Sequence, residues 1–372
     1  MQIQRLQVSN IRNLSRVSLP QLGPINIFCG PNGSGKTSLL EAVHLLLMGK
    51  SFRQARLRPL LTEGEEQCVV FAELLDSAKG RMTRGQSRQR DGSKPLIKLD
   101  GEPINLLSEL VKLVPVQVLG ADSFEMLIGG PGNRRQFLDW GLFHVEPNFY
   151  PAWRLAQRAL KQRNSLIRHG KIDRDQIHLW GREYARHGAQ VDKMRREYID
   201  RLLPLCRILL SELSPALLDR LDASYAQGWS KELNLADALQ QGLEGDLQQG
   251  HTRQGPHRAD LKVFAGDFLA GETLSRGQLK IVVAAFHLAQ TQLLRDITGK
   301  TSIFLVDDLA AELDSEHRRR LCLLLESLGV QTLMTLIDEV ELTECWARPE
   351  QVQVFHVERG EINPKPNSRG FE

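Results

Sequence analysis

Cysteine is scarce in this sequence, and long apolar runs are absent. The five cysteines lie far apart and never form a C-x-x-C pair, so their spacing supports neither a disulfide framework nor a zinc site. No uninterrupted apolar stretch approaches the roughly 20 residues that span a bilayer. The first ten residues, "MQIQRLQVSN", lack the apolar core of a secretory signal. We therefore expect a cytoplasmic protein with reduced thiols and no membrane contact.

Low-complexity tracts and internal repeats are also missing from the chain. The composition, 41% hydrophobic and 25% charged, excludes a chain that is disordered throughout and a collagen-like or fibrous protein. At 372 residues the chain exceeds the usual size of one domain, which favours two lobes.

The positive charge is unevenly distributed along the chain. The formal net charge is +3, yet residues 151–200 carry twelve Lys and Arg against six Asp and Glu. A second basic stretch, residues 81–98, carries six positive charges against Asp91. Such asymmetry indicates contact with a polyanion, although each cluster taken alone is equally compatible with a solvated helix face.

The hydrophobic pattern divides the chain into α/β ends and a helical middle. Strand patterns occur at residues 3–10, 13–19, 24–29, 66–76, 95–100, 259–266, 301–308 and 331–337, and a Gly- and Arg-rich link joins the fourth to the fifth. The helical pattern of the middle is interrupted by Pro147, Pro151, Pro204 and Pro215. We predict an α/β head made of residues 1–120 and 251–372, with a helical insertion lobe over residues 121–250.

The strongest motif is "GPNGSGKT", a full G-x-x-x-x-G-K-[ST] match between an apolar strand and a helix. Its glycines let backbone N–H groups point at phosphate oxygens, because the loop can wrap closely around them. The lysine reaches the outer phosphates, and the threonine hydroxyl is placed to bind Mg²⁺. The predicted nucleoside-triphosphate-binding residues are Gly30, Pro31, Asn32, Gly33, Ser34, Gly35, Lys36 and Thr37.

An acidic pair ends the apolar strand "SIFLVDD". A nucleotide site of this type needs a carboxylate at the end of a neighbouring strand, and burying two unpaired carboxylates in a core would be costly. We predict that Asp307 helps to hold Mg²⁺, together with Thr37, and that Asp308 is the catalytic residue that orients or activates the attacking water.

The motif order "GPNGSGKT", "LSRGQ", "LVDDLAAELD" resembles the ATP-binding-cassette superfamily. In that superfamily the LSGGQ-like signature closes over the γ-phosphate held by a second subunit, in a head-to-tail dimer with two ATP molecules between the chains. The resemblance implies that this chain contacts its partner's ATP through Ser275, Arg276, Gly277, Gln278 and Asp314. The superfamily usually has glycine where this chain has Arg276, so that side chain either strengthens the contact or points to solvent.

Further motifs narrow the resemblance. "LQVSNIRNL" resembles the opening of DNA-repair cassette ATPases. "DSFEMLIGGPGNRRQFLDW" and "GPHRADL" resemble motifs of the RecF family of bacterial recombination mediators. Taken together, the motifs that carry this resemblance are spread over nearly the whole chain. The expected fold is therefore an α/β, ABC/SMC-like P-loop ATPase head interrupted by a helical insertion domain. One departure from the superfamily is Leu336, which occupies the region where cassette ATPases have a switch histidine.

The RecF resemblance implies a function in recombinational DNA repair. Members of this family bind DNA, and they bind ATP together with Mg²⁺. They form an ATP-dependent homodimer and hydrolyse ATP slowly, so that ATP acts as a switch. With RecO and RecR they help to load RecA at single-stranded gaps, which supports replication and the SOS response. The basic middle offers a physical basis for DNA contact, since Lys and Arg neutralise phosphates. No stacking platform or base-reading motif is visible, which favours sequence-independent binding. The candidate DNA-binding residues are Arg134, Arg135, Arg154, Arg158 and Lys161.

Three other classes of protein fit less well. A transporter's ATPase subunit would have a much shorter segment between Lys36 and Ser275. An SMC-like structural protein would need long heptad arms, which the prolines of the middle interrupt. A metabolic phosphotransferase would leave "LSRGQ" and "AELD" unexplained.

Overall fold

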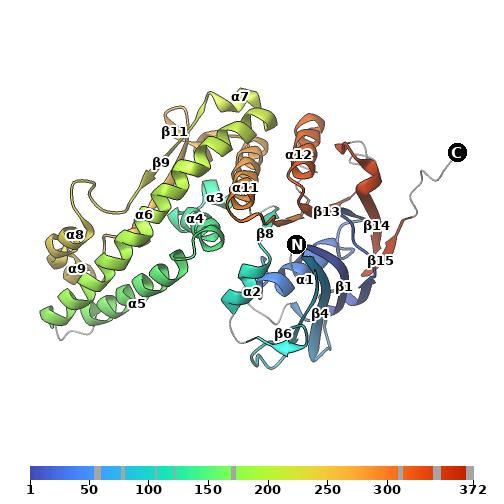
Figure 1. Ribbon diagram of the computed structural model, residues 1–372, viewed down its shortest axis with the longest axis horizontal. Helices are drawn as coiled ribbons and strands as arrows, with labels where there is room; N and C mark the ends of the chain where they lie inside the picture. The colour runs from blue at the N-terminus through green and yellow to red at the C-terminus, as the bar shows by residue number, and fades with distance from the viewer. Residues whose placement is uncertain are drawn as a thin grey trace. The chain divides into compact units, whose positions relative to one another are not determined.

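The computed structural model describes residues 1–53, 60–76, 80–104, 107–120, 123–168, 173–308, 313–337 and 345–365. The chain folds into two compact units (Figure 1). The first, here called the head unit, comprises Met1–Ser123 and Gly299–Glu372, and the second, the helical unit, comprises Phe124–Thr298.

The head unit begins with an antiparallel sheet in the order β2-β1-β4-β5-β6-β7. Its strands are β1 (Gln2–Ile11), β2 (Leu14–Leu19), β4 (Gln67–Asp76), β5 (Gly80–Gln89), β6 (Leu96–Leu99) and β7 (Glu102–Pro103). The prediction of a link between residues 76 and 95 was wrong, because β5 occupies most of it. Strand β5 pairs with β4 from Gln67↔Gln89 to Asp76↔Gly80, and this long-range ladder outweighs the low strand propensity of its Gly- and Arg-rich sequence.

The second sheet of the head unit is mostly parallel, in the order β15-β14-β3-β13-β12-β8. Its strands are β3 (Ile25–Cys29), β8 (Val116–Leu119), β12 (Ile303–Val306), β13 (Gln331–Leu336), β14 (Val352–Glu358) and β15 (Glu361–Pro364). Strands β3, β12 and β13 are buried at every position, as expected of parallel strands that are covered on both faces. The α-helices in the described part of this unit are α1 (Lys36–Met48), α2 (Leu107–Leu113) and α12 (Ser315–Ser327).

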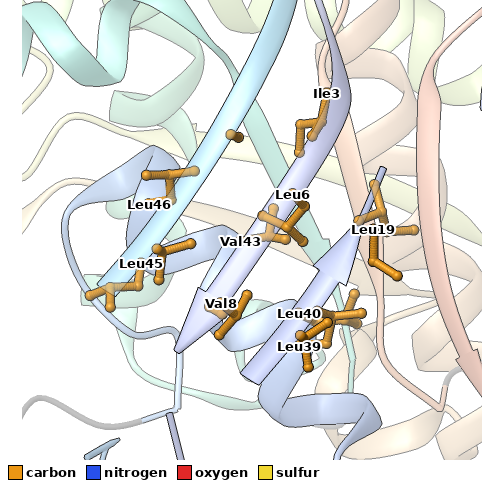
Figure 2. Packing of buried hydrophobic residues seen from close by; sticks show 14 of the residues in the cluster. Ile3, Leu6, Val8, Leu19, Leu39, Leu40, Val43, Leu45 and Leu46 are labelled. Carbon is orange, nitrogen blue, oxygen red and sulfur yellow. The ribbon is translucent and has the colours of Figure 1, made fainter. Parts of the chain in front are cut away.

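The core of the head unit lies between the antiparallel sheet and α1. Figure 2 shows Ile3, Leu6 and Val8 of β1 pointing toward Leu39 and Val43 of α1. These side chains are completely buried. Burying a side chain of this size stabilises a fold by about 1.5–3 kcal/mol, so this packing fixes α1 and the loop before it.

The helical unit is built on an antiparallel pair of long helices, α5 (Phe149–Arg168) and α6 (Arg174–Leu213) (Figure 1). Around them lie α3 (Glu125–Ile128), α4 (Pro131–Val145), α7 (Pro215–Leu218), α8 (Leu235–Gln241), α9 (Leu243–Gln249), α10 (Ala270–Thr273) and α11 (Arg276–Thr298), with a small sheet of β9 (Leu221–Ala226), β10 (Asp260–Ala265) and β11 (Phe268–Leu269). The prediction that Pro204 interrupts the helix was wrong. Pro204 lies inside α6 on its exposed side, where water can satisfy the carbonyl that loses its N–H partner.

The boundary of the helical unit differs from the predicted lobe on its C-terminal side. The sequence placed residues 251–372 in the head, whereas residues 251–298 pack in the helical unit. Two long-range contacts explain the difference: β10 pairs with β9, and α11 packs against α6. On the N-terminal side the compact units divide after Ser123, and residues 121 and 122 of the predicted boundary lie outside the described residues.

Candidate nucleotide-binding site

The loop Gly30–Thr37 joins β3 to α1 and requires glycine at defined points. A Cβ atom at Gly30 would lie 2.0 Å from the backbone oxygen of Val357 in β14, so no larger residue fits. Gly33 and Gly35 have φ values of 78° and 121°, which side chains other than glycine rarely adopt. The loop is therefore tight, and α1 begins at Lys36 with first-turn N–H groups that have no partner inside the helix.

Lys36 lies at the inner edge of this loop and is 5% exposed. Its Nζ donates hydrogen bonds to the backbone oxygens of Gly30, at 2.7 Å, and Pro31, at 3.0 Å. The ammonium group is thus held over the loop by carbonyl groups of the loop itself. Phosphate oxygens are stronger acceptors for a charged donor, so the lysine is placed to exchange these bonds for bonds to a nucleotide.

Asn13, in the turn between β1 and β2, braces the loop from outside, a function that the sequence did not reveal. Its Nδ2 donates to the backbone oxygen of Gly33 at 3.1 Å, and its Oδ1 accepts from the Ser38 hydroxyl at 2.9 Å. From the other sheet, the N–H of Gly360 donates to the backbone oxygen of Ser34 at 2.8 Å. The loop is therefore fixed by segments that are distant in sequence.

A buried ion pair fastens the same turn to α1. Arg12 binds the fully buried carboxylate of Glu41 with two nitrogens, and the Ser51 hydroxyl donates to that carboxylate as well. Removing one partner of a buried pair typically costs about 3–5 kcal/mol, so Arg12 and Glu41 hold the strand turn and the helix in one arrangement.

Asp307 and Thr37 meet at the carboxyl ends of the parallel strands. The Thr37 hydroxyl donates to Oδ1 of Asp307 at 2.9 Å, and the Thr335 hydroxyl donates to the same oxygen at 2.9 Å. The prediction placed Asp307 at the end of a strand next to β3, but β13 lies between β3 and β12. Thr335 of β13 fills this intervening position, which no local sequence signal indicated.

Asp308 follows with an unusual backbone conformation. Its φ is 50°, a left-handed value that Asp tolerates better than most residues, and its N–H donates to the Thr335 hydroxyl at 3.0 Å. The side chain is partly exposed next to the paired Thr37 and Asp307. It is therefore available to a water molecule in front of the strand ends.

Burial raises the pKa of the Asp307 carboxyl above 3.8, while hydrogen bonds from Thr335 and Thr37 oppose the shift. A hydroxyl and a carboxylate are the hard oxygen donors that Mg²⁺ prefers, and Mg²⁺ usually takes only one or two ligands from protein and the rest from water and phosphate. The pair formed by Thr37 and Asp307 fits that donor set. Within the described ranges, no group of three or more His, Cys, Asp or Glu side chains could hold a metal ion by itself.

Comparison with known proteins agrees with this geometry. The family model described as "RecF/RecN/SMC N terminal domain" matches residues 2–363. The "DNA replication and repair protein RecF" of Pseudomonas putida (strain W619) is 45% identical over 99% of this chain and 100% of its own length, and that of Pseudomonas paraeruginosa (strain DSM 24068 / PA7) is 44% identical over 98% of each. The chain belongs to the RecF family. The resemblance inferred from the motifs is thereby confirmed.

Solved structures show the fold of this RecF-family chain. The structure titled "Structure of the recombination mediator protein RecF-ATP in RecFOR pathway" aligns with a TM-score of 0.85 and 24% identity, covering 98% of this chain and 97% of that one. An Smc head bound to the C-winged helix domain of ScpA aligns with a TM-score of 0.60 and 14% identity, covering 98% and 97%. The expected ABC/SMC-like ATPase fold is confirmed.

The signature "LSRGQ" of the RecF-family chain forms the start of α11 in the helical unit. Ser275 precedes the helix, and its hydroxyl accepts from the N–H of Gln278 at 3.3 Å, while the Gln278 side chain accepts from the N–H of Ser275 at 3.0 Å. This reciprocal pair is a capping box, and it begins the helix at Arg276. Arg276 is exposed.

Asp314 serves as the N-cap of α12 in the head unit. Its side chain accepts from the N–H of His317 at 2.9 Å and contacts the His317 ring at 2.6 Å. Part of "AELD", residues 311 and 312, lies outside the described residues. The side chain of Asp314 is 62% exposed, so it remains accessible from solvent.

The candidate DNA-binding residues fall into two groups in the structure. Arg154, Arg158 and Lys161 are exposed on α5. Arg134 instead pairs with Asp260 at 2.6 Å with both side chains 11% exposed, and Arg135 donates to the backbone oxygen of Ala259 at 2.8 Å. These bonds engage Arg134 and Arg135 inside the helical unit, and contact of either residue with DNA stays a prediction.

No helix in the described part of the RecF-family chain has the length and apolar character needed to cross a membrane.

Proposed function

We propose that this chain is an ATP-driven switch of recombinational DNA repair. It binds ATP with Mg²⁺ at Gly30–Thr37, pairs with a second copy, binds single-stranded or gapped DNA, and helps to load recombinase in support of replication and the SOS response. The observation that carries the proposal is the pairing of Thr37 with Asp307 at 2.9 Å beside a phosphate-binding loop. Relatives are named as DNA replication and repair proteins, and one aligned structure is titled as a recombination mediator with ATP.

In this proposal the residues of the phosphate loop and of the strand ends each have a defined function. The Lys36 ammonium group exchanges its hydrogen bonds to the loop carbonyls for hydrogen bonds to the outer phosphates of ATP, and the loop N–H groups bind the inner phosphates. Thr37 and Asp307 hold Mg²⁺, which neutralises charge on the phosphates. Asp308 orients the attacking water. Turnover is slow and DNA-stimulated, which suits a switch.

The signature completes the site of a second copy. The capping box satisfies the N–H of Gln278, whereas the N–H groups of Arg276 and Gly277 in the first turn have no partner inside the helix. These donors and the positive end of α11 suit a γ-phosphate presented by another chain. Asp314 faces the same interface. The exposed basic face of α5 binds the DNA backbone, and RecR and RecO connect the dimer to RecA.

Light scattering with ATP, with ADP and without nucleotide tests the proposal. We expect the mass to double with ATP alone, because ADP lacks the γ-phosphate that joins the two copies. Lys36→Met should remain monomeric with ATP and keep its circular dichroism spectrum. A dimer that forms equally without ATP, or a Lys36→Met variant that dimerises normally, would contradict the proposed function.

A further inference from the structure

The residues just before the signature pack against the end of α3. Helix α3 contacts both α10 and α11 in the helical unit (Figure 1). A Cβ atom at Gly271 of α10 would lie 2.6 Å from the backbone oxygen of Leu127 and 3.1 Å from Cα of Ile128, so only glycine lets the two backbones approach this closely. Helix α10 ends at Thr273, and one residue separates it from Ser275. The position of the Leu127 carbonyl therefore fixes where the chain enters the signature.

Arg134, near the start of α4, holds this end of α3 in place. Its Nη1 donates to the backbone oxygen of Gly129 at 2.7 Å. The same nitrogen lies 3.4 Å from the backbone oxygens of Met126 and Leu127. The last carbonyls of a helix have no partner inside it, so an arginine at that end satisfies them. Arg134 thus binds the carbonyl group against which Gly271 packs.

The other nitrogens of Arg134 tie α4 to β10. Nε donates to Oδ1 of Asp260 at 2.6 Å and Nη2 donates to Oδ2 at 3.2 Å, and both side chains are 11% exposed. Beside this pair, Arg135 donates to the backbone oxygen of Ala259 at 2.8 Å. The motifs "DSFEMLIGGPGNRRQFLDW" and "GPHRADL" therefore meet at one guanidinium group. The proposed ATPase cycle uses neither motif.

We propose that Arg134 is a positioning residue for the signature. The inference rests on the proposed function, in which Ser275 and the first turn of α11 meet the γ-phosphate held by a second copy. Arg134 touches no nucleotide. It acts by holding Leu127 and Gly129, the end of α3 against which Gly271 packs. A misplacement of about 1 Å by a distant substitution can cost on the order of a hundredfold in rate, so this support matters for the composite site.

ATP-dependent dimerisation of Arg134→Met tests the proposal, because methionine keeps much of the bulk of the side chain without its donors. Light scattering of the full chain over a range of concentrations should show a dimer at least about tenfold weaker than that of the wild type. Binding of a fluorescent ATP analogue by the monomer should stay normal, because the loop Gly30–Thr37 is unchanged. The measurements are made at a temperature at which circular dichroism shows each protein to be folded.

Arg163→Met is the matched control. It removes a second buried arginine of the same unit, whose 2% exposed side chain pairs with Asp246 at 2.8 Å and joins α5 to α9. Breaking a buried pair is destabilising, so both variants should melt at a lower temperature than the wild type. Only Arg134→Met should weaken the dimer, because only Arg134 binds the carbonyl beside Gly271. Equal weakening by Arg163→Met would overturn the inference, since lost stability would then explain the effect.

Gly271→Ala tests the same contact from its other side. The added Cβ atom pushes α10 away from Leu127 while Arg134 keeps its bonds, so the dimer should weaken by a similar factor. In the double variant with Arg134→Met the loss should be smaller than the product of the two separate factors, because both act on one contact. Gly132→Ala, at an exposed helical glycine of α4 whose Cβ atom would lie 3.8 Å from Arg135, should dimerise like the wild type. Should Arg134→Met fold poorly, Gly271→Ala alone decides.

The outcomes separate this inference from the proposed function. A dimer of wild-type strength in folded Arg134→Met or Gly271→Ala would overturn the inference and leave the proposed function intact. Factors that multiply fully in the double variant would also overturn it, because Arg134 would then act elsewhere. A wild type that stays monomeric with ATP would refute both.

Discussion

Thr37 and Asp307 are 270 positions apart in the chain, yet the hydroxyl of one donates to the carboxylate of the other across 2.9 Å. Thr335 donates to the same carboxylate oxygen from the strand between them. The two oxygen donors proposed for Mg²⁺ therefore lie side by side at the ends of the parallel strands. Little rearrangement is needed when the metal arrives, and preorganisation of this kind lowers the free-energy cost of binding.

The first prediction concerns the pH dependence of Mg²⁺ binding. Burial raises the pKa of Asp307 above 3.8, so protons compete with Mg²⁺ at a higher pH than they would at an exposed Asp. Lowering the pH from 7 toward 5 should weaken Mg²⁺-dependent ATP binding, measured with a fluorescent ATP analogue. Asp307→Asn should weaken the Mg²⁺ dependence by about tenfold or more and reduce its change with pH.

The same shift predicts the sign of a stability effect. A carboxyl with a raised pKa holds its proton more strongly in the folded chain, so its contribution to stability is lost as the pH rises from 3.8 through the folded-state pKa. At pH 7 without nucleotide, Asp307→Asn should therefore melt at the same or a higher temperature than the wild type. A clearly lower melting temperature would argue that the ionised carboxylate stabilises the empty site.

The second prediction tests whether the signature serves another copy. Ser275→Arg should bind ATP nearly as well as wild type, because the loop Gly30–Thr37 is intact, but it should neither dimerise nor hydrolyse ATP. A bulky cation would stand where the capped start of α11 meets the γ-phosphate. Mixing Ser275→Arg with Lys36→Met leaves one composite site with both wild-type parts, so partial ATPase activity should return. Loss of ATP binding by isolated Ser275→Arg would show that the signature acts within its own chain.

The third prediction separates the two groups of basic residues. Reversing the charge of Arg154, Arg158 and Lys161 together should weaken DNA binding. The slope of log K against log salt should fall by roughly 0.7–0.9 for each DNA phosphate that the protein no longer neutralises. ATP binding should persist, because these side chains belong to α5 and not to the nucleotide-binding loop Gly30–Thr37. A salt slope equal to that of the wild type would show that these three side chains form an ordinary solvated helix face that does not contact DNA.

Arg134→Ala is the matched comparison for that experiment. It breaks the pair with Asp260, whose side chains are both 11% exposed, and should destabilise the helical unit by about 3 kcal/mol. Its DNA salt slope should stay close to that of the wild type under conditions where the variant is folded. A reduced slope with an unchanged melting temperature would restore Arg134 as a residue that binds DNA.

The fourth prediction concerns Asn13, which braces the phosphate loop. Asn13→Ala removes hydrogen bonds to Gly33 and Ser38, each worth about 0.5–1.5 kcal/mol, and should weaken ATP binding about threefold to tenfold. Ser38→Ala removes one of the two and should have the smaller effect. Equilibrium titration of both variants, with melting temperatures as a check on folding, distinguishes bracing of the loop from general destabilisation. Equal ATP affinities in both variants and wild type would show that the loop needs no brace.

Local sequence was sufficient for the phosphate loop and for the elements that flank it. The spacing of Gly30, Gly35 and Lys36 dictates a backbone path, and the apolar runs before Gly30 and Asp307 indicate buried strands. These features depend on neighbours a few residues away, so they can be read without knowing the fold. The capping box of Ser275 and Gln278 is local for the same reason.

Other features depend on partners far away in the chain, and the tertiary structure decided them. Strand β5 forms because β4 pairs with it. Helix α6 continues through Pro204 because that residue lies on the solvent side. Residues 251–298 belong to the helical unit because they pack against β9 and α6. Thr335 and Asn13 reach the site for the same reason. Their sequence neighbourhoods contain no signal for it, because a hydrogen bond to a distant loop depends on where two sheets place their ends. The sequence determined which residues can bind a nucleotide, and the packing of the two sheets around α1 decided which residues hold them in place.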